Sequence, residues 1–188
     1  MSQTVLITGA SNGIGKACAR VFARKGYDLV LVARHREKLE AVKAELSEYD
    51  VQIKVIAMDL TGEDAAVDLY NNLVLDDISI DILVNNAGFG DHGAFHDSSW
   101  EKQKKMVLLN IVALMQMTYV FGQSMKRRKK GRILNVASIA GLCAGPYMST
   151  YYATKAFVLS FSESIDYELK DYNVEVSCLC PGLSLIHI

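Results

Sequence analysis

Residues 4–15 read TVLITGASNGIG, a short apolar run that passes directly into a glycine-rich turn. A β-strand that leads at once into a helix leaves main-chain N–H groups and the positive end of the helix dipole facing outward. Glycines allow a phosphate to approach this main chain closely. The spacing is Gly-x3-Gly-x-Gly, which differs from the commoner G-x-G-x-x-G fingerprint. The turn therefore predicts a pyrophosphate site, and a merely tight turn is the alternative. The residues concerned are Thr8, Gly9, Ser11, Gly13 and Gly15.

Short β-branched runs alternate with amphipathic runs along the rest of the chain. We expect strands at 4–8, 28–33, 51–58, 80–85, 132–137 and 174–179. We expect helices from about residue 14 to a glycine cap at Gly26, and at 36–49, 61–76 (capped by Thr61), 100–130 and 150–172. Continuously apolar strands, each followed by a helix, indicate a parallel sheet covered on both faces. The pattern predicts a doubly wound α/β domain of the Rossmann type, with three αβα layers.

The chain of 188 residues suits one domain, and its hydrophobic content of 51% can fill a sizeable core. We expect residues 1–182 to form a single dinucleotide-binding catalytic domain. The final six residues, LSLIHI (183–188), do not continue the pattern. One back-translation of them resembles a transposon adapter used in sequencing libraries. We therefore expect a non-native tail on a truncated chain, with a chain that simply ends early as the alternative.

The net charge of −1 gives no electrostatic reason to expect nucleic acid or a membrane surface as a partner. The basic run at 126–130 closes a helical pattern, where cations complement the helix dipole. The apolar stretch 106–121 contains Asn110 and falls short of the ~20 residues that span a membrane. The four cysteines and four histidines show no metal-ligand spacing, so we expect no metal. Free thiols and an early first strand favour the cytoplasm.

Arg34 stands immediately after the second expected strand. In such sheets an acidic residue at this place binds the ribose 2′-hydroxyl of NAD(H), whereas an arginine accommodates a 2′-phosphate. The segment reads VARHR, with two arginines and no carboxylate. It therefore favours NADP(H) over NAD(H), and a surface arginine on a loop is the alternative.

Tyr151 and Lys155 are separated by one helical turn. Side chains at i and i+4 share a helix face, so an ammonium can lie near the phenol and stabilise its phenolate. A tyrosine tuned in this way is a better proton donor to a developing alkoxide. Alone, Tyr-x3-Lys arises readily by chance and usually marks a solvated helix face.

Taken together, the motifs of residues 4–182 resemble the short-chain dehydrogenase/reductase family. TGASNGIG matches the family's cofactor turn, and Asp59-Leu60 matches its adenine contact. Asn85-Asn86-Ala87-Gly88 matches the signature after the fourth strand, and Pro181-Gly182 the segment after the sixth. The resemblance implies cofactor binding by Gly9, Ser11, Asn12, Gly13, Ile14, Gly15, Arg34, Asp59, Leu60, Asn86, Ala87, Gly88, Tyr151, Lys155, Pro181 and Gly182.

The same resemblance implies a catalytic tetrad of Asn110, Ser138, Tyr151 and Lys155. In that family Tyr151 would exchange a proton with the substrate oxygen, and Ser138 would polarise that oxygen. Lys155 would bind the nicotinamide ribose, and Asn110 would hold a water that links Lys155 to solvent. The hydride belongs to the cofactor. The bland alternatives are a serine that ends a strand and a buried polar asparagine.

Two departures from the family pattern stand out. Asn12 lies where many NADP-preferring relatives carry a basic residue, so the cofactor prediction depends mainly on Arg34. The family pattern also continues past Pro-Gly with a nicotinamide-contacting segment, a substrate lid and a seventh strand. We find none of these and expect the fold to lack the last strand and the lid.

These features predict an oxidoreductase that reduces a ketone or oxidises a secondary alcohol. The loop 139–150 is apolar, at Leu142, Cys143, Pro146, Tyr147 and Met148, and suggests an apolar substrate. The string YYATKAFVLSFSE is similar to reductases of long-chain 3-oxoacyl thioesters. Apolar helices at 106–121 and 150–172 predict a homodimer or homotetramer. A non-catalytic nucleotide-binding protein or an inactive fragment are the alternatives.

Overall fold

The structure, a computed structural model, describes residues 2–182. Six parallel strands form one sheet in the order β3-β2-β1-β4-β5-β6. The strands are β1 (Thr4–Thr8), β2 (Asp28–Ala33), β3 (Ile53–Ala57), β4 (Ile82–Asn85), β5 (Gly131–Val136) and β6 (Val174–Leu179). The strand order reverses between β1 and β4, which is where doubly wound sheets bind ligands. The predicted fold class is confirmed, and the expected tail at 183–188 lies outside the described residues.

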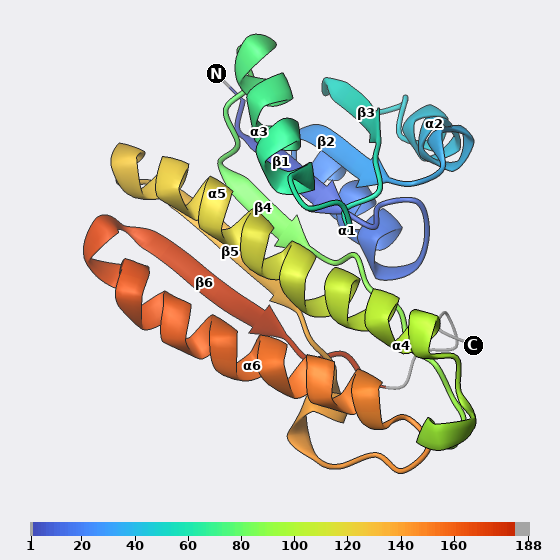
Figure 1. The fold of residues 1–188 in the computed structure, drawn as a ribbon. Coiled ribbons are helices and arrows are strands. Elements are labelled where there is room, and N and C mark those ends of the chain that lie inside the picture. The colour runs from blue at the N-terminus through green and yellow to red at the C-terminus, as the bar shows by residue number, and fades with distance from the viewer. Residues whose placement is uncertain (1, 183–188) are drawn as a thin grey trace.

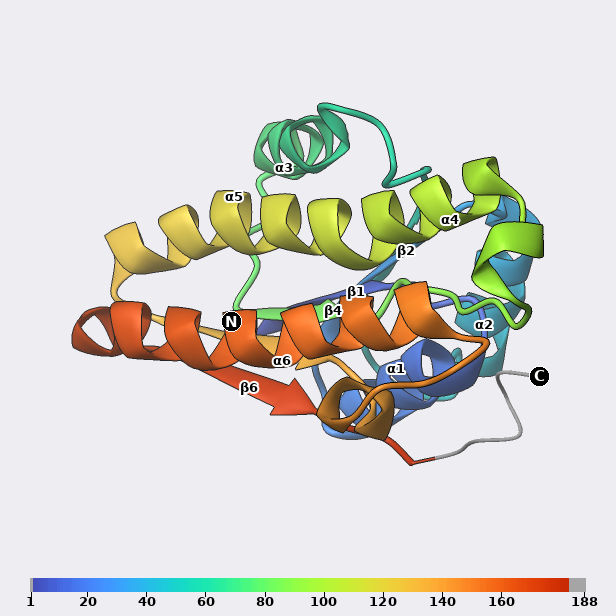
Figure 2. The same ribbon diagram turned by 60° about the horizontal axis from the view of Figure 1, so that its bottom comes forward.

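Helices cover both faces of this sheet (Figures 1 and 2). The helices are α1 (Gly13–Arg24), α2 (Arg36–Glu45), α3 (Ala65–Leu75), α4 (Trp100–Val107), α5 (Leu114–Arg128) and α6 (Ser149–Leu169). On one face Ala19 of α1 and Leu39 of α2 pack on Val5 and Leu31. On the other, Leu69 of α3 and Phe121 of α5 pack on Leu6 and Ile133, with Leu169 of α6 alongside. The core is therefore two apolar layers, one on each side of the sheet.

Several predicted boundaries differ from the structure. Thr61 does not cap a helix: its N–H and hydroxyl both donate to Asp59 Oδ1, at 3.0 and 2.8 Å, and α3 begins only at Ala65. Such a side-chain turn competes with helix formation. The helix expected at 36–49 ends at Glu45. Gly26 closes α1 with a φ of 79°, a left-handed conformation that glycine adopts without strain, as predicted.

The expected helix at 100–130 forms one continuous helix, in which a π-helical segment, Leu108–Ala113, separates α4 from α5. A π-turn carries an extra residue and is common at functional sites. By length and composition alone the whole helix from Trp100 to Arg128 is long and apolar enough to cross a membrane, although the apolar stretch 106–121 within it is shorter. Met117, Phe121 and Met125 are buried in the core, however, and the buried core helix of a soluble protein passes the same test.

A chain of buried polar side chains crosses the apolar layer between the sheet and helices α5 and α6. Asn85 Nδ2 donates to Thr118 Oγ1 and to Asn135 Oδ1, at 3.0 and 2.9 Å. Asn135 Nδ2 in turn donates to Ser162 Oγ at 3.0 Å, and Ser162 donates to the carbonyl of Val158. All four side chains in this polar seam are at most 3% exposed.

Candidate active site

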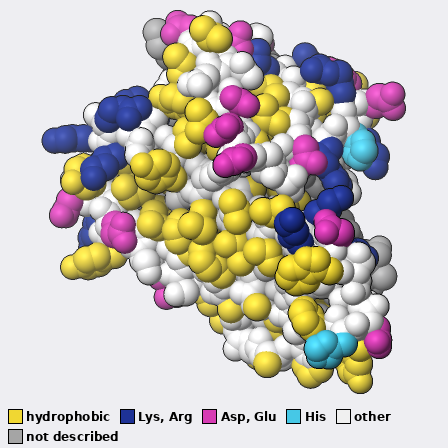
Figure 3. Space-filling view, viewed as in Figure 1, with side chains coloured by type: hydrophobic (Ala, Val, Ile, Leu, Met, Phe, Trp, Pro, Cys, Tyr) yellow, Lys and Arg dark blue, Asp and Glu magenta, His cyan; other side chains and the backbone are white. Residues whose placement is uncertain are grey.

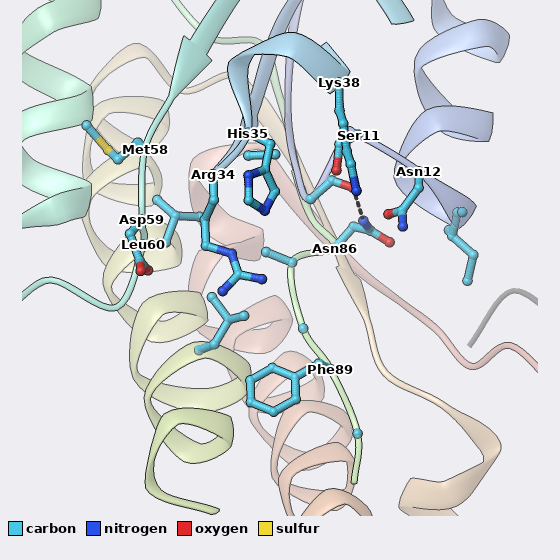
Figure 4. Close-up of a pocket in the computed structure, with 18 residues that line it drawn as sticks. Ser11, Asn12, Arg34, His35, Lys38, Met58, Asp59, Leu60, Asn86 and Phe89 are labelled. Atoms are coloured by element: carbon cyan, nitrogen blue, oxygen red, sulfur yellow. Dashed lines mark hydrogen bonds between the residues drawn. The ribbon is translucent and has the colours of Figure 1, made fainter. Parts of the chain in front are cut away.

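A pocket of about 460 Å³ lies at the carboxyl ends of β1 to β4, next to the point where the strand order reverses (Figure 4). Its walls come from the β1–α1 turn, the β2–α2 turn, the segment after β3 and the segment after β4. The residues that line it are Gly9, Ser11, Asn12, Gly13, Ile14, Ala33, Arg34, His35, Lys38, Met58, Asp59, Leu60, Asn86, Ala87, Gly88, Phe89, Gly90 and Leu109.

The β1–α1 turn requires glycine at positions 9 and 15. Gly9 has a φ of 65°, and a Cβ on it would lie 2.8 Å from Asn86 Nδ2 and 2.9 Å from the Cα of Ala87. A Cβ on Gly15 would lie 2.4 Å from the carbonyl oxygen of Gly9. Side chains at these places would collide with backbone, so only glycine lets the turn fold tightly on to the start of α1. The result is the backbone cradle that a phosphate group fits.

Thr8 and Asn86 fasten the turn after β1 to the turn after β4. Thr8 Oγ1 accepts from the N–H groups of Asn86 and Ala87, both at 3.0 Å. Asn86 Nδ2 donates to the carbonyls of Thr8 and Gly9, at 3.0 and 3.2 Å. Because these bonds cross between neighbouring strands, the two turns form one rigid floor. The sequence pattern places Thr8 in the turn but does not predict that its hydroxyl joins the two turns.

The far wall of the pocket carries positive charge. Arg34, in the β2–α2 turn, and Lys38, near the start of α2, line this wall with His35 between them (Figure 4). Among the described residues 2–182, Asp59 is the only one with a carboxylate that lines the pocket. Its pKa is lowered chiefly by the main-chain N–H of Thr61, with the Thr61 hydroxyl, Arg34 and Lys105 acting in the same direction. Asp59 is therefore firmly ionised and partly neutralises Arg34. The sequence prediction named Arg34 but missed Lys38, which shares its wall one helical turn later.

Tyr151 and Lys155 of α6 lie beside each other, and Lys155 reaches the end of β5, the strand that Ser138 follows. Lys155 is 6% exposed, and its Nζ donates to the carbonyl of Val136 at 2.7 Å. The same Nζ lies 5.8 Å from the centre of the Tyr151 ring. Ser138, two residues after Val136, accepts from the N–H of Ala140 at 3.1 Å. The expectation that Lys155 and Tyr151 share one face is confirmed.

Burial lowers the pKa of Lys155 to about 8, and nearby Cys178 and Cys180 oppose this shift. An ammonium is disfavoured in an apolar surrounding, and the short hydrogen bond to Val136 offsets part of that cost. The pKa of Lys155 therefore lies near the neutral range, where a side chain can both gain and lose a proton.

Asn110 lies on the π-helical segment and is 1% exposed. Its Nδ2 donates to the carbonyl of Phe89 at 2.9 Å and to Thr154 Oγ1 at 3.1 Å, while its Oδ1 accepts from the N–H of Phe89 at 3.1 Å. The amide therefore holds both the segment after β4 and the helix that bears Tyr151. Its implied contact with a water stays a prediction.

Gly88 is the point at which the pocket and the tetrad meet. It lines the pocket, and a Cβ on it would lie 2.9 Å from Asn110 Oδ1 and 3.7 Å from Lys155 Nζ. Gly90, two residues on, would place a Cβ 3.2 Å from the Tyr151 ring. The segment Gly88–Phe89–Gly90 therefore runs in close contact with three tetrad residues because it has no side chain at either end.

Most predicted cofactor residues line this pocket, but five do not. Gly15 is buried at the start of α1, Lys155 and Tyr151 lie beside Gly88 and Gly90, and Pro181 and Gly182 follow β6 outside the pocket lining. The carbonyl of Pro181 accepts from the N–H of Ile139 at 3.0 Å, which keeps the segment after β6 next to Ser138. Phe89 and Leu109 also line the pocket, and no motif pointed to them. Among residues 2–182 no group of three or more potential metal ligands is found.

This fold and site define a dinucleotide-binding α/β protein of the oxidoreductase type. The family model for short chain dehydrogenases matches residues 3–185. Nodulation protein G of Rhizobium sp. (strain N33) is 36% identical over 96% of this chain and 72% of its own length. The very-long-chain 3-oxoacyl-CoA reductase of Phaeosphaeria nodorum is 36% identical over 93% of this chain, but this chain covers only 52% of it.

Solved structures agree with these relatives. A short-chain dehydrogenase from Sphingobium yanoikuyae in complex with NADPH has a TM-score of 0.90 and 38% identity, over 96% of this chain and 71% of its own. The bulky-bulky ketone specific alcohol dehydrogenase from Comamonas testosteroni has a TM-score of 0.90 and 37% identity, over 96% and 72%. The chain belongs to the short-chain dehydrogenase family, and it spans between about half and three quarters of the length of these relatives.

Proposed function

We propose that this protein is an NADP(H)-dependent oxidoreductase that interconverts a ketone and a secondary alcohol. The observation that carries the proposal is Gly88, which lines the pocket while its missing side chain leaves room for Asn110 and Lys155. A dinucleotide laid from Arg34 along the glycine turn toward Gly88 would end beside Tyr151. The cradle formed by Gly9 and Gly15 fits the pyrophosphate of such a molecule.

In this proposal the chain's own residues handle the substrate oxygen and its proton. Tyr151 transfers the proton, and Ser138 donates a hydrogen bond that polarises the oxygen. Lys155 supplies positive charge beside Tyr151 and has a pKa suited to passing a proton onward. Asn110 acts as a positioning residue through its bonds to Phe89 and Thr154. A nicotinamide bound here would supply or accept the hydride.

NADP(H) is favoured over NAD(H) because Arg34 and Lys38 line the wall where a ribose 2′-phosphate would lie. An Arg guanidinium offers a fork of donors that fits a phosphate, and a Lys adds a point charge. The relative from Sphingobium yanoikuyae was solved with NADPH, which supports the same choice. NAD(H) remains the second candidate because Asp59 lies beside Arg34.

The substrate is proposed to be an apolar ketone or a 3-oxoacyl compound. The exposed side chains of Leu142 and Tyr147, at 65% and 62%, flank the tetrad on the β5–α6 loop. Relatives include the 3-oxoacyl-CoA reductase above and the mouse 17-beta-hydroxysteroid dehydrogenase type 3, which is 36% identical over 96% of this chain and 60% of its own length. Both names describe substrates in which the reacting carbonyl or hydroxyl group sits on an apolar acyl chain or ring system.

The test is turnover of NADPH with a panel of apolar ketones, followed by absorbance. Tyr151→Phe should abolish turnover, by ~10²–10⁴-fold in kcat, and leave NADPH affinity nearly unchanged, because the phenol contacts the substrate oxygen. Tyr152→Phe is the matched control, since Tyr152 is the next residue of the same helix and its ring packs on Gly145. If Tyr151→Phe keeps most of the activity, another acid transfers the proton. If NADPH binds but no carbonyl is reduced, the protein is a nucleotide-binding module.

We further propose that residues 1–182 act as one catalytic domain, which pairs into a homodimer or homotetramer. Apolar side chains gather along α5 and beside α6 on the face shown in Figure 3. Val112, Met115, Tyr119 and Tyr167 are 38%, 40%, 68% and 82% exposed. An exposed apolar strip of this kind favours association. The cytoplasmic location stays a prediction.

A further inference from the structure

Two loops beside Tyr151 are joined directly to each other. One leads from β4 to α4 and the other from β5 to α6, and they lie side by side at the same end of the molecule (Figures 1 and 2). The N–H of Gly93 donates to the carbonyl of Tyr147 at 2.8 Å. The rings of His92 and Tyr147 are stacked, with centres 6.1 Å apart and planes 26° apart. This pair of rings is the only stacked contact between the two loops among residues 2–182.

The stacked pair lies next to the proposed proton donor. Gly90, two residues before His92, approaches the Tyr151 ring so closely that a Cβ would lie 3.2 Å from Cδ2. The methyl carbon of Met148, the neighbour of Tyr147, would lie 3.5 Å from the same Cβ. The β4–α4 loop, which carries His92, and the β5–α6 loop, which carries Tyr147, therefore both lie close to the Tyr151 ring.

Tyr147 is held in a conformation that its own side chain disfavours. Its φ is 64°, which is uncommon for any residue with a side chain and more so for a bulky one. The ring gains nothing from the core in return, because it is 62% exposed. Strained positions of this kind cluster at binding sites, where the surroundings hold them in place.

The β4–α4 loop, which carries His92, is held in place by α4. Asp91 forms an ion pair with Lys102 of α4, and Gln103 Nε2 donates to Asp91 at 3.4 Å and to Ser98 at 3.1 Å. His92, which follows Asp91 directly, is exposed. The β4–α4 loop is therefore fixed on α4 through Asp91, while the imidazole ring of His92 stacks on Tyr147.

We propose that His92 and Tyr147 form one wall of the substrate entrance and select ketones that carry a flat, unsaturated ring next to the carbonyl. This inference rests on the proposed function and deepens it. A rigid pair of aromatic faces binds planar rings by offset or edge-on stacking, which adds ~0.5–1.5 kcal/mol beyond the burial of area. A linear chain of equal carbon number gains only the burial, so the pair discriminates between the two shapes.

The experiment compares kcat/KM for an aryl alkyl ketone with that for an aliphatic ketone of the same carbon number. His92→Ala and Tyr147→Asn remove one ring each, and asparagine tolerates the positive φ. Each variant should lose about 3- to 10-fold with the aryl ketone and less than about 2-fold with the aliphatic one. His92→Phe and Tyr147→Phe keep an aromatic ring at each position and should retain the native preference for the aryl ketone. His96→Ala, an exposed histidine of the same loop that faces Phe95, is the control.

Equal losses with both ketones would mean that the pair only stabilises the loops, and unchanged values would mean that no ring contacts the substrate. Either result overturns the inference. A second readout does not depend on turnover: the ring proton signals of His92 in the NADP-bound protein should shift when the aryl ketone is added, and not with the aliphatic one. If these signals shift but no ketone is turned over, the proposed activity is wrong although His92 and Tyr147 do contact the aryl ketone. If turnover is normal and the signals do not shift, only the inference about His92 and Tyr147 is wrong.

Discussion

Lys155 Nζ donates a 2.7 Å hydrogen bond to the main-chain carbonyl of Val136, so a buried cation on α6 is tied to the last residue of β5. The segment that leads to Ser138 therefore starts from a point fixed by Lys155. The position of the serine and the charge of the lysine are coupled through the Ala137 and Ser138 peptide groups.

The pKa of Lys155 makes a prediction about stability against pH. Burial lowers this pKa from 10.5 to about 8, so between about pH 8 and 10.5 the unfolded chain binds more protons than the folded one. The stability of the native protein should therefore rise with pH through that window, by at most ~3 kcal/mol, relative to Lys155→Met. Urea unfolding of both proteins at pH 7 to 10 measures the difference, and Lys170→Met, at an exposed site, is the control. A constant difference across this range would contradict the lowered pKa.

Arg34→Asp should reverse the cofactor preference. The carboxylate would repel a 2′-phosphate and accept a hydrogen bond from a 2′-hydroxyl. We expect kcat/KM for NADPH to fall by at least ~10-fold and that for NADH to rise, because hydrogen bonds between charged groups contribute ~1.5–3 kcal/mol. Lys38→Ala should weaken NADPH less, because it removes a point charge and not a fork of donors. An unchanged preference in Arg34→Asp would show that Arg34 does not contact the 2′-phosphate.

Gly88→Ala should cost both stability and activity. The new methyl group would lie 2.9 Å from Asn110 Oδ1, which must then move and release the N–H of Phe89. Overpacking of this kind typically costs ~1–3 kcal/mol. Thermal unfolding and NADPH turnover measure the two effects. The matched control is Gly62→Ala, whose methyl group would meet Ala65 Cβ at an ordinary 3.7 Å. Equal behaviour of the two variants would mean that the pocket and the tetrad do not meet at Gly88.

The apolar strip along α5 and α6 predicts that Tyr119→Glu or Tyr167→Glu dissociates the oligomer. A charge placed in a buried interface lacks a partner and is costly to desolvate. Sedimentation velocity at micromolar concentration should show a dimer or tetramer for the native protein and a monomer for either variant. Leu75→Glu is the control because Leu75 is 85% exposed at the end of α3. A native protein that is a folded monomer would contradict the prediction.

The sequence predicted the sheet and the motifs well, because each depends on local residues. β1, β2 and β6 have the predicted bounds. Gly9, Ser11 and Gly13 of the glycine turn line one pocket together with Arg34, Asp59 and Asn86. What the sequence could not show depends on contacts between distant segments. Lys38, on α2, lines the same pocket wall as Arg34, and Asn110, on the π-helical segment, forms hydrogen bonds with the main chain of Phe89.

Side-chain contacts also decided the local errors. Thr61 has the composition of a helix cap, but Asp59 engages its N–H and hydroxyl first. The stacking of His92 on Tyr147 joins residues from two loops, and no periodic pattern encodes it. The positive φ of Tyr147 is equally hidden from composition, since tyrosine rarely adopts it.

The polar seam of Asn85, Thr118, Asn135 and Ser162 constrains how β4 and β5 align with each other during folding. Apolar strands such as β4 and β5 could slide past each other and still bury their side chains. A slip by two residues would separate Asn85 from Asn135 and Asn135 from Ser162, and leave several amide groups without hydrogen bonds inside the core. The polar seam therefore favours one alignment of the strands. It raises the free energy of slightly misaligned structures by more than it lowers that of the native one.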